Sequence, residues 1–222
     1  MANNVMDTAN IINFFVALGT CLAVMVALFA KGQTSFENTF NILLTQHNDA
    51  LTKLKENRNY NEKVSDIFNL PNDFDLSNLT KNMHNLDYFF GSYFRVLYHL
   101  LKHIDKNGGY HPFDHKGKKK YTSLVRSFLD NETTLLLAIN CSHAKNNNQY
   151  YHYKCLIERY AFFEHLIVDK GKFYDYIKYS DGNLKYSINY IEQSDPLFVD
   201  KLISEIFKTY HSSAFGDHED LY

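Results

Sequence analysis

Four histidines with paired spacing are the first candidates for chemistry in this sequence of 222 residues. His99 and His103 stand four positions apart, as do His111 and His115, and two acids (Asp105 and Asp114) lie nearby. Two His residues at positions i and i+4 of a helix share one face, which is a spacing used by zinc ligands. The alternative is that His99 is a structural histidine beside an apolar helix face. No Cys pair supports a metal, so we expect no metal and no cofactor, and the four histidines remain weak candidates.

Arg159 and His165 are the only candidates that we find for catalysis. They are separated by five residues, a spacing that resembles the Arg…His element of helical ribonucleases of the HEPN type. In those proteins the two side chains meet across a dimer and act on the RNA phosphate. Here the polar residue that usually follows the Arg is replaced by Tyr160, which departs from the pattern. The alternative is a surface Arg paired with an acid such as Glu158.

Lys116, Lys118, Lys119 and Lys120 form a local basic patch in a segment that we predict to be a polar loop, Gly108 to Lys120. Such runs are usually solvated, but near a membrane each basic residue contributes about 1 kcal/mol of attraction to anionic headgroups. The sequence contains no glycine-rich phosphate loop, no Gly-x-Ser-x-Gly and no Cys-x-x-Cys. These observations favour a protein that is not an enzyme.

Composition predicts an all-α protein. The chain has 18 Phe and 17 Tyr but only 9 Gly and 3 Pro, so few residues interrupt long helices. The net charge of −2 gives no overall field that would attract nucleic acid, and we expect no direct nucleic-acid partner. Cys21, Cys141 and Cys155 lie in apolar or helical patterns, which is typical of reduced packing residues in a reducing compartment.

The amino-terminal segment predicts a single transmembrane helix. No charged residue occurs from Thr8 to Ala30, and Ile11 to Ala30 is almost wholly apolar, which matches the thickness of a bilayer core. A buried core helix and a cleaved signal peptide are the alternatives. Asp7 precedes the span, and all 23 basic residues follow it. The positive-inside rule therefore predicts a main domain in the cytoplasm, with the short amino terminus outside.

One face of this span carries small and polar side chains. At about 100° per residue, these side chains fall within one arc: Asn13, Val16, Gly19, Thr20, Ala23 and Ala27. Small residues let helix backbones approach, and Asn13 and Thr20 could hydrogen-bond across such a contact. The face therefore predicts a homo-oligomer that packs partly within the membrane. The alternative is chance, since small residues are common in membrane helices.

Apolar residues recur at spacings of three and four from Leu79 to Ile104, which predicts one central amphipathic helix from Leu76 to Ile104. Asp75 or Ser77 would cap its start, and Gly108 lies at its end. Further helices are expected at 34–56, 121–129, 130–139, 154–169 and 196–211, with the first either capped at Thr34 or continuous with the span. The stretch 173–191 fits a hairpin or two short helices. The domains are then the tail and span (1–33), a helical cytoplasmic domain (34–211) and a flexible tail (212–222).

Several of these segments resemble the putative phage abortive infection protein family, the AbiC-like proteins of bacteria. The resemblance lies in Thr39 to His47, Tyr93 to Asp105, Tyr121 to Asp130, Glu132 to Cys141 and Lys154 to Tyr160. It implies an antiphage role in which the infected cell stops growing or dies, and it carries over no catalytic residues. Members often have two amino-terminal spans where this chain shows one.

Three functions stay open from the sequence. The first is a membrane-anchored effector that perturbs the membrane or engages a partner. The second is an anchored ribonuclease that uses Arg159 and His165. The third is a non-toxic module that tethers a separately encoded defence protein.

Overall fold

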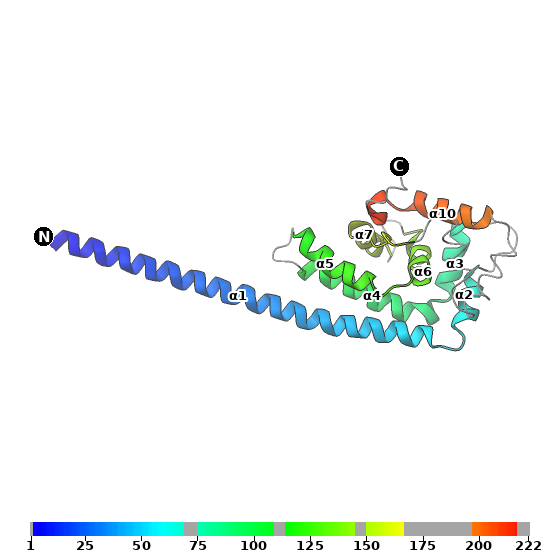
Figure 1. Ribbon diagram of the computed structural model, residues 1–222, viewed down its shortest axis with the longest axis horizontal. Coiled ribbons are helices and arrows are strands. Elements are labelled where there is room, and N and C mark those ends of the chain that lie inside the picture. The colour runs from blue at the N-terminus through cyan, green and yellow to red at the C-terminus, as the bar shows by residue number, and fades with distance from the viewer. Residues whose placement is uncertain (1, 69–74, 109–113, 145–149, 167–196, 217–222) are drawn as a thin grey trace. The chain divides into compact units, whose positions relative to one another are not determined.

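The computed structural model describes residues 2–68, 75–108, 114–144, 150–166 and 197–216, and within these ranges the chain is helical with no strands (Figure 1). Its elements are α1 (Ala2–Lys55), α2 (Tyr60–Phe68), α3 (Leu76–Asn85), α4 (Asp87–Asn107), α5 (His115–Arg126), α6 (Asn131–Cys141), α7 (Tyr151–Arg159), α10 (Leu197–Thr209) and the 3-10 helix η1 (Ser212–Phe215). The all-α prediction is therefore confirmed for the described residues.

The chain divides into two compact units, Met1–Ile42 and Leu43–Tyr222, and the division falls inside α1. The helix itself is not interrupted there. The hydroxyl of Thr34 donates to the carbonyl of Ala30 at 3.0 Å, which is a bond made by a residue in the middle of a helix. Thr34 is thus no amino-terminal cap, and of the two arrangements that the sequence allowed, the structure has the continuous helix.

The predicted central helix is two helices that meet at Leu86. Leu86 has φ −97° and ψ 17°, which ends α3 and starts α4. The sequence does not show this break because the apolar spacing continues across it. The eight apolar residues at spacings of three and four form one seam along both helices. All of them are buried, namely Leu79, Met83, Leu86, Phe90, Tyr93, Leu97, Leu100 and Ile104. Asp75 caps α3 by accepting from the backbone N–H of Ser77, and Gly108 follows the end of α4, as predicted.

Every residue of helix α6 is buried, both the apolar run Leu135 to Ile139 and the polar residues on either side of it. A buried helix must find partners for its terminal backbone groups. Asp130 accepts from the N–H of Thr133 at 2.8 Å at the amino end. At the carboxyl end, the carbonyls of Ala138, Ile139 and Asn140 contact two side chains of α3 and that of Tyr210, which directly follows α10. These are Tyr210 Oη at 2.6 Å, Thr80 Oγ1 at 3.2 Å and His84 Nε2 at 3.0 Å.

Two predicted helix boundaries were wrong. Helix α5 begins at His115 rather than near Tyr121, because Asp114 accepts from the N–H of Gly117 and caps the helix. Helix α7 ends at Arg159 rather than near Asp169. The chain turns at Ala161, whose φ is 50°, and the guanidinium of Arg126 donates to the Ala161 carbonyl at 2.5 Å. This tertiary hydrogen bond holds a turn that local sequence does not predict.

The carboxyl-terminal tail also differs from the prediction. Ser212–Phe215 forms η1, in which Ala214 and Phe215 are buried. The ring of Phe215 lies 4.4 Å from that of Phe207, centroid to centroid, so aromatic packing orders a segment that we expected to be frayed. The predictions for residues 173–191, for the start of the last helix at Pro196 and for residues 217–222 lie outside the described residues.

Candidate functional site

The amino-terminal part of α1 is long and apolar enough to cross a membrane. None of its most apolar window is buried, whereas the core helix of a soluble protein would bury most of it; an amino-terminal signal sequence would pass the same test of length and composition. The six residues of the predicted packing face are all exposed: Asn13, Val16, Gly19, Thr20, Ala23 and Ala27. A side chain added at Gly19 would meet no atom within 4 Å. The hydroxyl of Thr20 donates to the Val16 carbonyl of its own helix at 2.8 Å.

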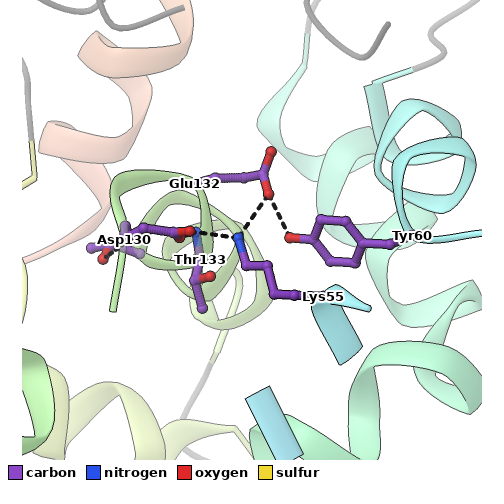
Figure 2. A network of polar contacts seen from close by, with 6 residues as sticks. Lys55, Tyr60, Asp130, Glu132 and Thr133 are labelled. Carbon is purple, nitrogen blue, oxygen red and sulfur yellow. Dashed lines mark hydrogen bonds and ion pairs between the residues drawn. The ribbon is translucent and has the colours of Figure 1, made fainter. Parts of the chain in front are cut away.

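The carboxyl-terminal end of α1 carries a polar network that joins three helices (Figure 2). Nζ of Lys55 lies 2.6 Å from Oδ2 of Asp130 and 3.1 Å from Oε1 of Glu132. The hydroxyl of Tyr60, the first residue of α2, donates to the same Glu132 oxygen at 2.5 Å. We call Lys55, Tyr60, Asp130 and Glu132 the α1–α6 clamp.

Burial and charge set the protonation states in the clamp. The side chain of Glu132 is only 8% exposed and that of Lys55 is 27% exposed. Burial alone would lower the pKa of Lys55, but Glu132 and Asp130 raise it overall. Burial would raise the pKa of Asp130, but Lys55 and the Thr133 N–H lower it. Burial and the negative charge of Glu132 raise the pKa of Tyr60. The lysine is therefore charged and the tyrosine neutral at physiological pH.

Lys55, Tyr60 and Asp130 therefore do not exchange protons near pH 7. The clamp is suited to holding the last turn of α1 near the start of α6, since Lys55 contacts two carboxylates at once and hydrogen bonds between charged groups are roughly twice as strong as neutral ones. The clamp could not be found from the sequence. Asp130 was expected only as the first residue of the helix at 130–139, and no local signal relates Lys55 to residues 75 and 77 positions away.

The histidine candidates lie in different surroundings. His99 is exposed on α4, His103 contacts Asn107 at 3.2 Å near the end of that helix, and His115 is exposed at the start of α5. His111 lies outside the described residues. Within the described ranges, no three His, Cys, Asp or Glu side chains are placed to share a metal ion.

Arg159 and His165 contact different partners in the structure. Arg159 Nη1 lies 2.7 Å from Oδ1 of Asp105, which also accepts from the Tyr160 hydroxyl at 2.6 Å. Burial would raise the pKa of Asp105, but Tyr160 and Arg159 lower it. Nε2 of His165 lies 3.5 Å from the guanidinium of Arg126. Within this chain the two residues are thus not on one helix and do not face a common site.

The basic patch is helical rather than a loop, because α5 includes all four lysines. Lys118 is buried, whereas Lys116, Lys119 and Lys120 are exposed. Two large apolar side chains continue the exposed side of the same segment: Leu124 is 44% exposed and Phe128 is 43% exposed. We call Lys116, Lys119, Lys120, Leu124 and Phe128 the α5 face. No acidic residue occurs between Lys116 and Leu129.

Comparison with known proteins gives one match. Residues 85–171 match the model of the family described as putative phage abortive infection protein. This match confirms the resemblance found from the sequence over that range, which includes α4, α5, α6 and α7. No curated protein and no solved structure matches the chain.

Proposed function

Because residues 85–171 match the phage abortive infection family, we propose that this protein is a membrane-anchored antiphage effector that halts growth of the infected cell or kills it. The observation that supports anchoring is α1. Its apolar stretch is uncharged and wholly exposed, and the same helix continues to the clamp at Lys55. A helix of this kind is stable where lipid covers its side chains.

In this proposal the amino terminus lies outside the inner membrane and the larger unit lies in the cytoplasm. The distribution of charge supports that orientation, since Lys and Arg occur only after the apolar stretch. Copies of the chain would associate through the face that contains Gly19, Ala23 and Ala27, so the effector would be a homo-oligomer.

The α5 face would rest on the same membrane. Lysines attract anionic headgroups, and Leu124 and Phe128 are apolar enough to enter the boundary between headgroups and acyl chains. Because Lys118 is buried, it would not take part. The face is short, so we expect it to orient the larger unit on the membrane rather than to anchor it.

Infection would act on this arrangement in one of two ways. Either the spans rearrange and the membrane becomes permeable, or the larger unit engages a partner such as a separately encoded defence protein. In both cases the clamp would transmit a change at α6 to the last turn of α1, because it ties the two elements together through charged hydrogen bonds.

A membrane-potential dye, read during phage infection of cells that express the protein, tests the proposal. We expect depolarisation to coincide with growth arrest. Leu18→Arg combined with Leu22→Arg should abolish both, since each Arg costs roughly 2.5–3.5 kcal/mol at the centre of a span. The matched control is Tyr88→Arg on α4, where the side chain is already 73% exposed.

The same cells separate the alternatives. Arrest with a polarised membrane would contradict membrane perturbation. Cleaved tRNA or ribosomal RNA, lost in an Arg159→Ala, His165→Ala double variant, would support the ribonuclease instead. The tethering module would be supported by two results together. Protection would require the product of a neighbouring gene that co-purifies with this protein, and this protein alone would not be toxic.

A further inference from the structure

An open pocket of about 300 Å³ lies on the larger unit, between α4 and the start of α7. Its lining residues all fall between Asp87 and Tyr153, so the whole pocket lies inside the range that matches the family. A volume of this size is at the lower end for small-molecule sites, which span roughly 300–1,000 Å³. It would hold one ring system with a substituent, but not two.

One side of the pocket is a single face of α4. Asp87, Gly91 and Arg95 follow one another at intervals of four, so they stack along that face, and His99 comes one turn later. Arg95 Nη1 lies 3.0 Å from Oδ2 of Asp87. The bridge passes over Gly91, where an added Cβ would overlap the Asp87 carboxylate. Glycine therefore leaves the space in which the acid and the guanidinium meet.

The other surroundings are aromatic, with one buried amide. Tyr98 and Tyr150 are half-buried, and the ring of Tyr98 lies 5.3 Å from that of Tyr153. Asn140 is 5% exposed, and its amide nitrogen donates to Sγ of Cys141 over 3.9 Å. This is a long contact for a side chain that can make four hydrogen bonds.

We propose that this pocket binds a nucleoside monophosphate, or more generally a planar heteroaromatic ring that carries one anionic group. The tyrosines supply surfaces on which a ring can stack, and the amide of Asn140 can pair with the donors and acceptors on the edge of the ring. Arg95 offers a planar fork of donors to a phosphate, with the His99 imidazole one turn further along α4.

A quaternary ammonium ligand is the main alternative, because aromatic residues beside an acid also form cation cages. Two observations oppose it. Arg95 already occupies the carboxylate of Asp87, and Arg95 itself would repel a cation in the pocket. The two ligand classes therefore predict opposite effects of the same substitution. Removing the charge of Asp87 frees Arg95 and should strengthen the binding of an anion, whereas it should weaken the binding of a cation.

The test is calorimetry and thermal stabilisation of the full-length protein in detergent, with AMP, GMP, CMP and UMP tested singly against tetramethylammonium. We expect at least one nucleotide to bind. Arg95→Gln should weaken it about tenfold or more, since hydrogen bonds to charged groups are worth roughly 1.5–3 kcal/mol. Asp87→Asn should strengthen it about threefold, and Tyr98→Leu should weaken it about fivefold or more through lost stacking.

Arg159→Gln is the matched control, because it also removes a partly exposed Arg from an ion pair but lies outside the pocket. Melting temperatures without ligand show whether each variant is folded. Absence of binding by all four nucleotides at millimolar concentration would overturn the assignment. So would tetramethylammonium binding that Asp87→Asn weakens. The inference concerns the larger unit alone, so its outcome is independent of whether α1 enters a membrane.

Discussion

The ammonium group of Lys55 lies 2.6 Å from a carboxylate oxygen of Asp130, a residue 75 positions later in the chain. The same ammonium group also forms an ion pair with the buried Glu132. Loss of the lysine would therefore leave the Glu132 carboxylate buried without this positive charge. Asp130 is 44% exposed, and solvent screens that part of the interaction.

Lys55→Met should lower the free energy of unfolding by about 1–3 kcal/mol, because one charge of a partly buried network loses its partner. Lys53→Met is the control, since Lys53 is exposed in the same helical turn. Urea denaturation followed by circular dichroism measures both. Adding Glu132→Gln to Lys55→Met should recover part of the loss; equal stability of Lys55→Met and wild type would show that the clamp contributes little.

Tyr210→Phe should cost about 1–3 kcal/mol of stability, because it leaves the buried carbonyl of Ala138 without the hydroxyl that donates to it at 2.6 Å. Tyr88→Phe removes a hydroxyl from a side chain that is 73% exposed and should cost almost nothing. The two variants can be compared in the same denaturation experiment. A cost below about 0.5 kcal/mol for Tyr210→Phe would mean that another group replaces the hydroxyl.

His47 should make the protein sensitive to mild acid. It has no exposed surface, its ring stacks on Tyr93 with centroids 5.5 Å apart, and neither nitrogen has a hydrogen-bond partner among the described residues. Burial lowers the pKa of His47 from 6.5 to about 4, so the folded protein holds the neutral ring. As the pH is lowered, His47 of the unfolded chain binds a proton at a higher pH than His47 of the folded protein. The free energy of unfolding should therefore decrease as the pH drops from 6.5 to 4.

The loss attributable to His47 should approach about 3 kcal/mol at pH 4. His47→Phe should remove this part of the pH dependence while keeping the stacked ring. His152→Phe is the control, because His152 is exposed. The measurement is the difference in unfolding free energy between pH 7.5 and pH 4.5 for each protein. Identical differences for wild type and His47→Phe would contradict the assignment.

Gly19→Leu should weaken self-association in mild detergent or lipid by on the order of 1 kcal/mol or more, because the larger side chain pushes helix backbones apart without reducing hydrophobicity. Ala23→Leu should act alike, and Asn13→Leu should cost somewhat less. Leu22→Ala on the opposite face should change little. Native mass spectrometry or crosslinking gives the oligomer distribution. The prediction would be contradicted if the wild-type protein were monomeric. It would also be contradicted if the Gly19→Leu variant assembled and protected cells like the wild type.

Phe128→Trp tests the α5 face, since the chain has no tryptophan of its own. In nanodiscs that contain anionic lipid, we expect blue-shifted emission that brominated acyl chains quench. Neutral lipid, or Gln in place of Lys116, Lys119 and Lys120, should reduce the quenching because the attraction to headgroups is lost. Tyr88→Trp on α4 is the reference for an exposed position. Emission like that of Tyr88→Trp in every lipid would show that the face does not touch the membrane.

The helices that could be predicted from the sequence are those whose burial follows a local period. Leu79 to Ile104 keep one apolar seam, and Asp75 and Asp130 are caps that bond within three residues of themselves. The break at Leu86 leaves that seam in phase, so periodicity cannot detect it. The start of α5 was missed because a Gly- and Lys-rich segment has little apolar pattern, although Asp114 is a cap of an ordinary kind.

What could not be predicted depends on contacts between distant residues. Arg126 fixes the turn at Ala161 from 35 positions away, which also separates Arg159 from the helix that would have carried His165. The pocket needs a face of α4, the end of α6 and the start of α7 at once. No spacing within one segment indicates that Asp87 and Tyr153 line the same space.

The hydrogen bond from Tyr210 to Ala138 also constrains the order in which the chain can mature. Its donor is synthesised 72 residues after its acceptor, a delay of about 4–14 s at translation rates of roughly 5–20 residues per second. During that interval the carboxyl end of α6 lacks one of its partners, while the apolar stretch of α1 has already left the ribosome. If α1 inserts as proposed, the nascent chain would therefore reach the membrane before its core can close.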